Sequence, residues 1–494
     1  MHSEKSISLL LFLATAMIPA VVNGGELQGA RRAISLAAAD TVAESPAPGS
    51  RTSHDGFAML IAGGDIGGNV LHLVPNAMFV TSTDGAQIYD SVAGRFRQTA
   101  GRLHDSRETA TATLLPNGKV LIAGGLRCSN GILGSHCTAL DTAELYDPAT
   151  GRFTLAGTGS GSKMTAARAG HSATLIHGCN CPADGKVLLV GGISGTVKTS
   201  FRGIVSSPPV DTAEFYDPAI DTFVAATAKM KERRENHCAA LLADGRVLIA
   251  GGDDTGFFEH ALATAEIYDP RTGSFAPTGR MEIVRELARA TVLDPAIVKG
   301  ALAGDVLVSG GLVAGARLAG DSSATAELFD PRAGRFIQVG SRMSSPRIRH
   351  SSVLLNSGPL AGQVLIAGGI QLRGDGTARG VRQTSQTTAD IFDPSGGGSG
   401  DFRPTGELNE ARGGHAFALL SGGPNSGEVL VAGGENCDGK SPSFCYVAGS
   451  SQDQSARNPG VAAELFDPTT GAWTPVRAAM PVPVSAASYE AVSP

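Results

Sequence analysis

Residues 230–252, MKERRENHCAALLADGRVLIAGG, and residues 264–275, TAEIYDPRTGSF, contain the elements of a pattern that recurs along the 494-residue chain. In each copy a short run rich in Val, Leu and Ile ends in a pair of glycines. Such a run predicts a buried strand, because it is too short and too β-branched for a helix. The glycine pairs are Gly63-Gly64, Gly124-Gly125, Gly191-Gly192, Gly251-Gly252, Gly310-Gly311, Gly368-Gly369 and Gly433-Gly434.

A second strand signal, an aromatic residue followed by Asp, comes after each glycine pair. Six copies resemble Thr-Ala-Glu-Leu-Tyr-Asp-Pro, and a turn then leads to one further aromatic residue. Asp-Pro followed by a turn reverses the chain between adjacent strands. The aromatic residues before Asp are Tyr89, Tyr146, Tyr216, Tyr268, Phe329, Phe392 and Phe466, and the later ones are Phe96, Phe153, Phe223, Phe275, Phe336, Phe402 and Trp473.

An Arg-x-x-His segment precedes most of the glycine-pair strands. Counting four and seven residues forward from the apolar residue that ends a unit, such as Met230, gives an arginine and then a histidine or alanine, and a short strand follows. The arginines are Arg107, Arg168, Arg234, Arg285, Arg347 and Arg412, and the histidines are His171, His237, His350 and His415. Each unit therefore predicts four short strands joined by turns such as Ala243-Asp244-Gly245-Arg246.

Four antiparallel strands repeated around a ring form the blades of a β-propeller. We therefore predict an all-β, seven-bladed propeller over residues 54–494. The first copy begins at its second strand, near Phe57–Ala62, and residues 484–492 add a first strand after the last unit. We expect these two strands to pair in one blade and close the ring, which removes exposed strand edges.

This pattern closely resembles the kelch-repeat β-propeller family, of the galactose oxidase central-domain-like superfamily. The resemblance implies that the Arg-x-x-His segments line one mouth of the central channel. Six guanidiniums there, with the four histidines just inside, can bind carboxylate or phosphate groups. The alternative is structural: the arginines pair with backbone carbonyls or with neighbouring acids such as Glu108, Glu235 and Glu286.

Two further features of the repeat have structural interpretations. The glycine pairs lack the lysine and the following helix of a phosphate-binding loop, so we expect them to serve crowded strand ends. The carboxylate before each aromatic residue recurs in six units, whereas a general acid or base is one distinctive group. We expect hydrogen bonding between blades from Glu144, Glu214, Glu266, Glu327, Asp390 and Glu464.

The seven cysteines fit an oxidising compartment. Cys128 and Cys137 lie in one long loop after a glycine pair, and Cys437 and Cys445 lie in the corresponding loop of a later unit, so two disulfides are predicted. The pairing of Cys179, Cys181 and Cys238 is left open. The odd count leaves at least one thiol free or intermolecular.

The first residues of the chain and its composition indicate where the protein is located. Residues 1–24 resemble a signal peptide, with Lys5 before an apolar run, and residues 25–53 are an Ala-, Pro- and Ser-rich linker. We expect a secreted or periplasmic protein with no membrane span in the mature chain. The net charge of −6 argues against nucleic-acid binding.

Two functions follow from this interpretation. The first is a non-catalytic binding module that contacts a protein, peptide or glycan through the loops of one propeller face, with an anion as a candidate ligand. The second is a secreted enzyme acting on carbohydrate, like galactose oxidase or a sugar mutarotase. The sequence singles out no catalytic residue, metal-ligand set or cofactor.

Overall fold

The computed structural model describes most of the chain from residue 58 onward. The described residues are 58–63, 82–131, 134–157, 163–200, 203–256, 260–315, 318–374, 381–421, 423–437, 439, 445–447, 461–476, 480 and 488–492. The expected signal peptide and linker, residues 1–53, lie outside these ranges. Within them all regular elements are β-strands, as the all-β prediction requires, and no helix has the length and apolar character of a membrane span.

The repeated units fold into four-stranded antiparallel sheets whose strands follow chain order. The first strand of each sheet follows an Arg-x-x-His or Arg-x-x-Ala position, the second ends at a glycine pair, and the third and fourth carry the two aromatic residues. Six such sheets are β4(Thr111–Leu114)–β5(Val120–Ala123)–β8(Ala143–Asp147)–β9(Arg152–Leu155), β10(Ser172–Leu175)–β11(Val187–Val190)–β14(Ala213–Asp217)–β15(Thr222–Ala225), β16(Cys238–Leu241)–β17(Val247–Ala250)–β18(Ala265–Asp269)–β19(Ser274–Pro277), β20(Arg289–Val292)–β21(Val306–Ser309)–β24(Ala326–Asp330)–β25(Arg335–Gln338), β26(Ser351–Leu354)–β27(Val364–Ala367)–β30(Ala389–Asp393)–β31(Asp401–Pro404) and β32(Ala416–Leu419)–β33(Val429–Ala432)–β36(Ala463–Asp467)–β37(Ala472–Pro475).

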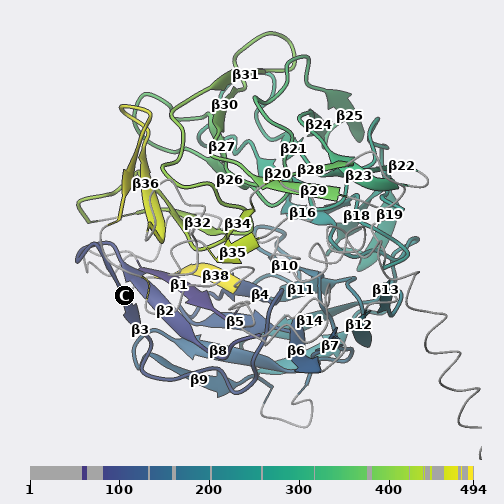
Figure 1. Cartoon of the computed structure of the whole chain (residues 1–494). Coiled ribbons are helices and arrows are strands. Elements are labelled where there is room, and N and C mark those ends of the chain that lie inside the picture. The colour runs from purple at the N-terminus through teal and green to yellow at the C-terminus, as the bar shows by residue number, and fades with distance from the viewer. Residues whose placement is uncertain are drawn as a thin grey trace, which may run out of the picture.

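A further sheet of the same form combines strands from distant parts of the chain. Its order is β38(Ser488–Val492)–β1(Ala58–Ala62)–β2(Ala86–Asp90)–β3(Arg95–Gln98). Ala58 lies opposite Val492 and Ala62 opposite Ser488 in an antiparallel register. Neighbouring first strands contact one another in the order β4, β10, β16, β20, β26, β32, β38, and β38 also contacts β4. Figure 1 shows the sheets arranged around this set of strands.

Side-chain chemistry explains the layers. All four residues of the second strand are buried in β5 and its equivalents, because both faces of the sheet are covered by neighbouring sheets. The fourth strand buries at most its aromatic residue, which is buried in β9 and partly buried in β25 and β31. This residue packs on the aromatic residue of the third strand; the Tyr146 and Phe153 ring centroids lie 5.0 Å apart. One hydrophobic cluster joins Leu60 of the first sheet to Val120 and Phe153 of the next.

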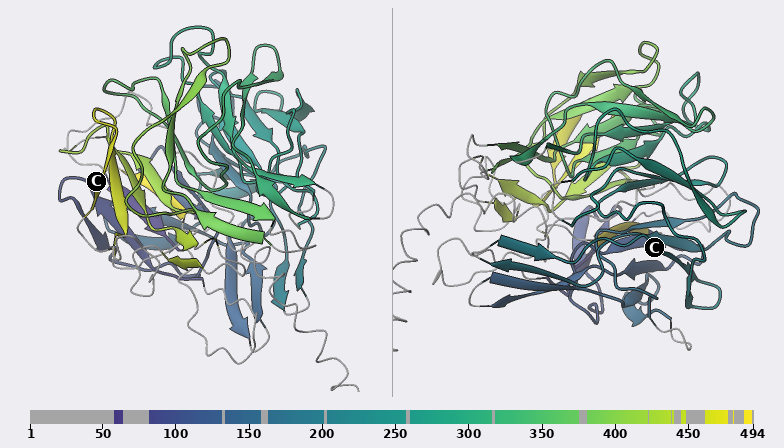
Figure 2. Two further views of the ribbon diagram at one scale, coloured as in Figure 1. Left: turned by 45° about the horizontal axis from the view of Figure 1, so that its top comes forward. Right: turned by 90° about the vertical axis from the view of Figure 1, so that its right-hand side faces the viewer.

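Hairpins inserted after the glycine pairs project from one side of the molecule (Figure 2). Two of them, β6(Leu126–Gly131)–β7(Gly134–Ala139) and β12(Thr196–Ser200)–β13(Gly203–Ser206), form one four-stranded sheet because β7 pairs with β12. The other hairpins are β22(Leu312–Gly315)–β23(Leu318–Ser322), β28(Ile370–Gly374)–β29(Val381–Ser385) and β34(Glu435–Cys437)–β35(Cys445–Val447). Strand β23 contacts β28, and β29 contacts β34. The insertions therefore form two groups, the four-stranded β6–β7–β12–β13 sheet and the three linked hairpins, which together we call the hairpin layer.

Candidate functional site

The six repeated arginines lie in the interior. Each side chain is 0–1% exposed. In the unit of Arg234, Nη1 donates to the carbonyl oxygens of Gly251 at 2.6 Å and Thr264 at 3.1 Å, and Nη2 donates to Glu266 at 3.3 Å. The other five units repeat this arrangement, with carboxylate partners Glu144, Glu214, Glu327, Asp390 and Glu464. The arginines thus pair with backbone carbonyls, as the structural alternative holds, but with these acids rather than Glu108, Glu235 or Glu286.

The repeated carboxylates fix the segments that connect one sheet to the next. Glu266 accepts hydrogen bonds from the backbone N–H groups of Lys231 and Glu232 at 2.8 and 3.2 Å, and Glu327 does the same for Glu282 and Ile283. These N–H groups belong to the connection that precedes a first strand. The carboxylates therefore act as structural hydrogen-bond acceptors, as their regular recurrence predicts.

The glycine pairs are likewise structural. Gly251 has φ of +69°, and a Cβ on it would collide with the carbonyl oxygen of Arg285, which belongs to the next sheet. The N–H of Gly252 donates to the same oxygen at 2.8 Å. Equivalent bonds join Gly125 to Arg168, Gly192 to Arg234, Gly311 to Arg347 and Gly369 to Arg412.

The four histidines are buried between sheets rather than exposed at a mouth. Nε2 of His171 lies 3.1 Å from Thr111 Oγ1, and Nε2 of His237 lies 2.8 Å from Ser172 Oγ, in each case on the preceding first strand. Burial lowers the pKa of His171 to about 3, helped by the nearby Arg168 charge. Burial also holds the pKa values of His237, His350 and His415 well below the usual range. These imidazoles are neutral at physiological pH.

These contacts favour the structural role for the six arginines and for His171 and His237. A ligand would have to reach guanidiniums that already donate to carbonyls and carboxylates inside the fold. Anion binding by the arginines stays a prediction, and its test is given below.

The residue two positions after each arginine distinguishes the units from one another. It has a left-handed backbone in six units, at Thr109, Gly170, Asn236, Leu287, Arg349 and Gly414, with φ between 52° and 63°. Backbone bonds of 2.9–3.0 Å link some of these residues in sequence, from Asn236 N–H to Gly170 and from Leu287 N–H to Asn236. A left-handed Leu or Arg is uncommon and persists only where the surroundings enforce it.

Around these positions lies a buried polar group that the repeat does not explain. Asn236 donates to Glu286 Oε1 at 2.8 Å, and Arg349 lies 3.4 Å from Glu435. Burial, together with nearby Asp253, raises the pKa values of Glu235 and Glu286 well above the usual range. Burial lowers the pKa of Arg349 to about 9 against the opposing effect of Glu435. Departures from the repeat between Arg and His are the sequence signal that could have located this group.

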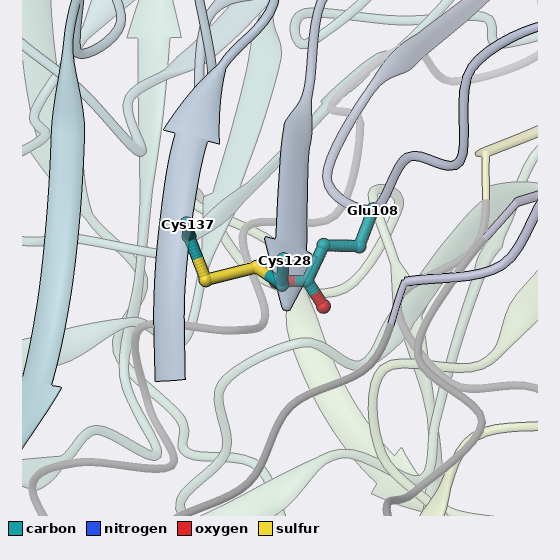
Figure 3. A group of neighbouring side chains, drawn as sticks. All are labelled: Glu108, Cys128 and Cys137. Carbon is teal, nitrogen blue, oxygen red and sulfur yellow. A yellow bond between two sulfur atoms is a disulfide. The ribbon is translucent and has the colours of Figure 1, made fainter. Parts of the chain in front are cut away.

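The cysteines pair as predicted, and a buried glutamate accompanies both loop disulfides. Disulfides join Cys128 to Cys137, Cys437 to Cys445 and, in a pairing left open by the sequence, Cys179 to Cys181; Cys238 is a buried thiol outside these disulfides. Glu108 Oε1 lies 3.0 Å from Cys128 Sγ, and Glu435 Oε2 lies 4.0 Å from Cys437 Sγ. Figure 3 shows Glu108 beside the first of these disulfides.

The exposed cations of the hairpin layer were not singled out from the sequence. Arg373 on β28 lies directly opposite Arg382 on β29, and both side chains are exposed. Lys198 on β12 is also exposed, and Arg127 on β6 is half-exposed beside Asp105. These cations lie on a protein whose net charge is −6, and the exposed Asp321 of β23 accepts a hydrogen bond from the Gly374 N–H in the same layer.

Comparison with known proteins gives the fold. No family model matches the chain, and no curated protein matches it. A fungal alcohol oxidase of the AA5 family, solved in complex with copper, aligns over 79% of this chain and 73% of its own with 17% identity and a TM-score of 0.51. The structure of YjhT aligns over 69% of this chain and 96% of its own, with 14% identity and a TM-score of 0.45. The oxidase likeness supports the fold alone, an all-β architecture of the propeller type.

Proposed function

We propose that the chain is an exported, seven-bladed β-propeller, closed by β1 and β38, that binds an anionic ligand on its hairpin layer. The cyclic contacts among first strands support closure. The disulfides support export, since disulfides persist in oxidising compartments. The partner that fits this layer is an acidic glycan, peptide or protein surface.

One observation carries the anionic preference. Arg373 and Arg382 occupy directly opposed positions of an antiparallel pair, where Cβ atoms are about 4.5–5.5 Å apart and like charges destabilise the hairpin. Among the described residues, neither guanidinium forms an ion pair with a carboxylate. A carboxylate, sulfate or phosphate group placed between them would relieve the repulsion and accept charged hydrogen bonds.

The rest of the hairpin layer suits recognition. Loops held on a rigid scaffold carry specificity, and here hydrogen bonds between β7 and β12 and two disulfides hold the insertions in place. Lys198 adds a further exposed cation to this layer. An extended anionic chain could therefore contact more than one hairpin.

A panel of acidic glycans, acidic peptides and small anions tests the proposal on the full chain. The double variant R373S/R382S should lose binding at least tenfold while keeping the parent melting temperature. The matched control R95S/R97S removes the same charge from two exposed positions on β3 and should bind like the parent. Equal binding by both variants would reject the site, and sugar oxidation or mutarotation by the purified chain would favour the enzyme alternative.

A further inference from the structure

Two hairpins carry the same chemical group at equivalent positions. Cys128 faces Cys137 across β6 and β7, and Cys437 faces Cys445 across β34 and β35. The N–H of Cys128 donates to Ser82 Oγ and that of Cys437 to Ser385 Oγ, each at 3.0 Å. The β28–β29 hairpin has the same frame, with Leu372 N–H donating to Ser322 Oγ at 3.0 Å, but it places Leu372 opposite Gln383. The three hairpins therefore share this backbone-to-serine hydrogen bond, but only two of them carry a cysteine pair at the opposed positions.

A buried carboxylate completes each group. Glu108 is 0% exposed, and its Oε1 lies 3.0 Å from Cys128 Sγ. Glu435 is 7% exposed and lies 4.0 Å from Cys437 Sγ. In each group the two sulfurs and a carboxylate oxygen all lie within 4.8 Å of one another. Figure 3 shows the Glu108 carboxyl group beside the Cys128–Cys137 bond.

A disulfide sulfur has no hydrogen to donate, so the neighbouring carboxylate gains no hydrogen bond from it in the oxidised state, although Glu435 also forms an ion pair with Arg349. Beside two thiolates the carboxylate supplies a third donor of a kind that zinc accepts. Zinc takes thiolate sulfurs at about 2.3 Å and carboxylate oxygens at about 2.0–2.2 Å in tetrahedral geometry, so its donors lie within about 4 Å of each other. Two thiolates and one carboxylate leave one coordination position, and near Cys437 the amide oxygen of Gln383, 3.9 Å from that sulfur, can supply it.

We propose that these two groups, when reduced, are zinc sites: Glu108–Cys128–Cys137 and Glu435–Cys437–Cys445. A dithiol reductant breaks each S–S bond by two exchange steps, supplies two electrons and two protons, and becomes a disulfide itself. Zn²⁺ then displaces the two thiol protons and holds the same strands together. A small-molecule disulfide accepts two electrons by thiol–disulfide exchange, becomes two thiols, re-forms the protein disulfide and releases Zn²⁺, so each hairpin keeps a cross-link in both redox states.

Zinc stoichiometry on the full chain tests the proposal. The oxidised chain should bind no zinc, and the chain reduced by a dithiol reductant and freed from it should bind two ions, releasing two protons for each. The variants C128S/C137S and C437S/C445S should each bind one. C179S/C181S, which removes the third disulfide, should still bind two.

Glu108→Gln separates a zinc ligand from a structural glutamate because it keeps both cysteines. It should weaken the first site about tenfold or more without changing the second, and the disulfide should still form in the oxidised chain. A reduced chain that keeps its far-ultraviolet circular dichroism and binds no zinc would overturn the proposal. So would an unchanged count of two ions in C128S/C137S.

Discussion

The N–H of Gly252 donates a 2.8 Å hydrogen bond to the carbonyl oxygen of Arg285, a residue of the next sheet. Gly251, one residue earlier, has φ of +69° and leaves room for the same carbonyl only because it lacks a Cβ. The second strand of one sheet is in this way bonded to the connection that begins the next. Five such bonds occur among the described residues.

Gly251→Ala should therefore lower the free energy of unfolding by about 2–4 kcal/mol, since it combines a strained left-handed backbone with a collision. Urea denaturation measures this. Gly118→Ala is the control, because Gly118 has φ of +80° but a Cβ added there would meet no other atom within 4 Å. It should cost about 1 kcal/mol. Equal losses would mean that contact with the next sheet contributes nothing.

Arg234→Met should destabilise the fold by about 3–5 kcal/mol, because it leaves the buried Glu266 carboxylate without its cation. The double variant R234M/E266Q should recover part of that loss, which a double-mutant cycle would detect as coupling. Arg95→Met, at an exposed position, should change little.

The same arginines allow a test of their predicted anion-binding role. R168A/R234A should unfold at a lower temperature than the parent. An anion that stabilises the parent but not a folded R168A/R234A would instead support binding by the arginines.

The buried histidines should make stability depend on acid. The pKa of His171 falls from 6.5 in the unfolded chain to about 3 in the fold, so its contribution is fully present above pH 6.5 and is lost as the pH falls toward 3. The slope is about 1.4 kcal/mol per pH unit for each such histidine. Urea midpoints at pH 7.5, 5.5 and 4.5 should show a shallower decline for His171→Asn than for the parent.

Glu235 and Glu286 act in the opposite direction. Their raised pKa values favour the folded state below the unfolded value of 4.5, and this benefit is lost as the pH rises through their folded values. Glu286→Gln should therefore steepen the decline of stability on acidification.

For the histidine prediction, an identical pH profile of stability for His171→Asn and the parent would show that the imidazole is not held neutral.

Removal of residues 488–494 should leave β1 without its neighbour and expose its edge. The shortened chain should aggregate or melt well below the parent, as measured by light scattering and calorimetry. Removal of residues 1–50, which leaves β1 and its pairing intact, is the control. A monomeric shortened chain with the parent melting curve would contradict closure of the ring.

Much of this architecture follows from repetition. Equivalent residues such as Arg168 and Arg234 had to occupy equivalent places, so register alone predicted strand order and the Cys128–Cys137 and Cys437–Cys445 pairs. The burial of the arginine side chains was not predictable in this way. The register of the repeat does not say whether a side chain enters a channel or turns back into its own sheet. The arginines turn back, toward Gly191 and Gly251 carbonyls.

The pairing within the hairpin layer could not be predicted from the repeat, because its segments differ between units. The segments share part of their frame but differ in sequence from unit to unit, so the pairing of Val197 with Cys137 and the opposition of Arg373 and Arg382 have no counterpart in the other described hairpins. The left-handed backbone of Leu287 also runs against its own propensity, because surrounding sheets impose it. The repeated four-stranded sheets build the scaffold, and the unit-specific hairpins carry the candidate binding surface.

The pairing of β1 with β38 has a consequence for biosynthesis. Residues 58–62 leave the ribosome early, whereas their partners at 488–492 emerge only after the strands of the other described sheets. The edge of β1 that pairs with β38 therefore stays unpaired until residues 488–492 are made, and a chaperone that shields strand edges would be needed there longest.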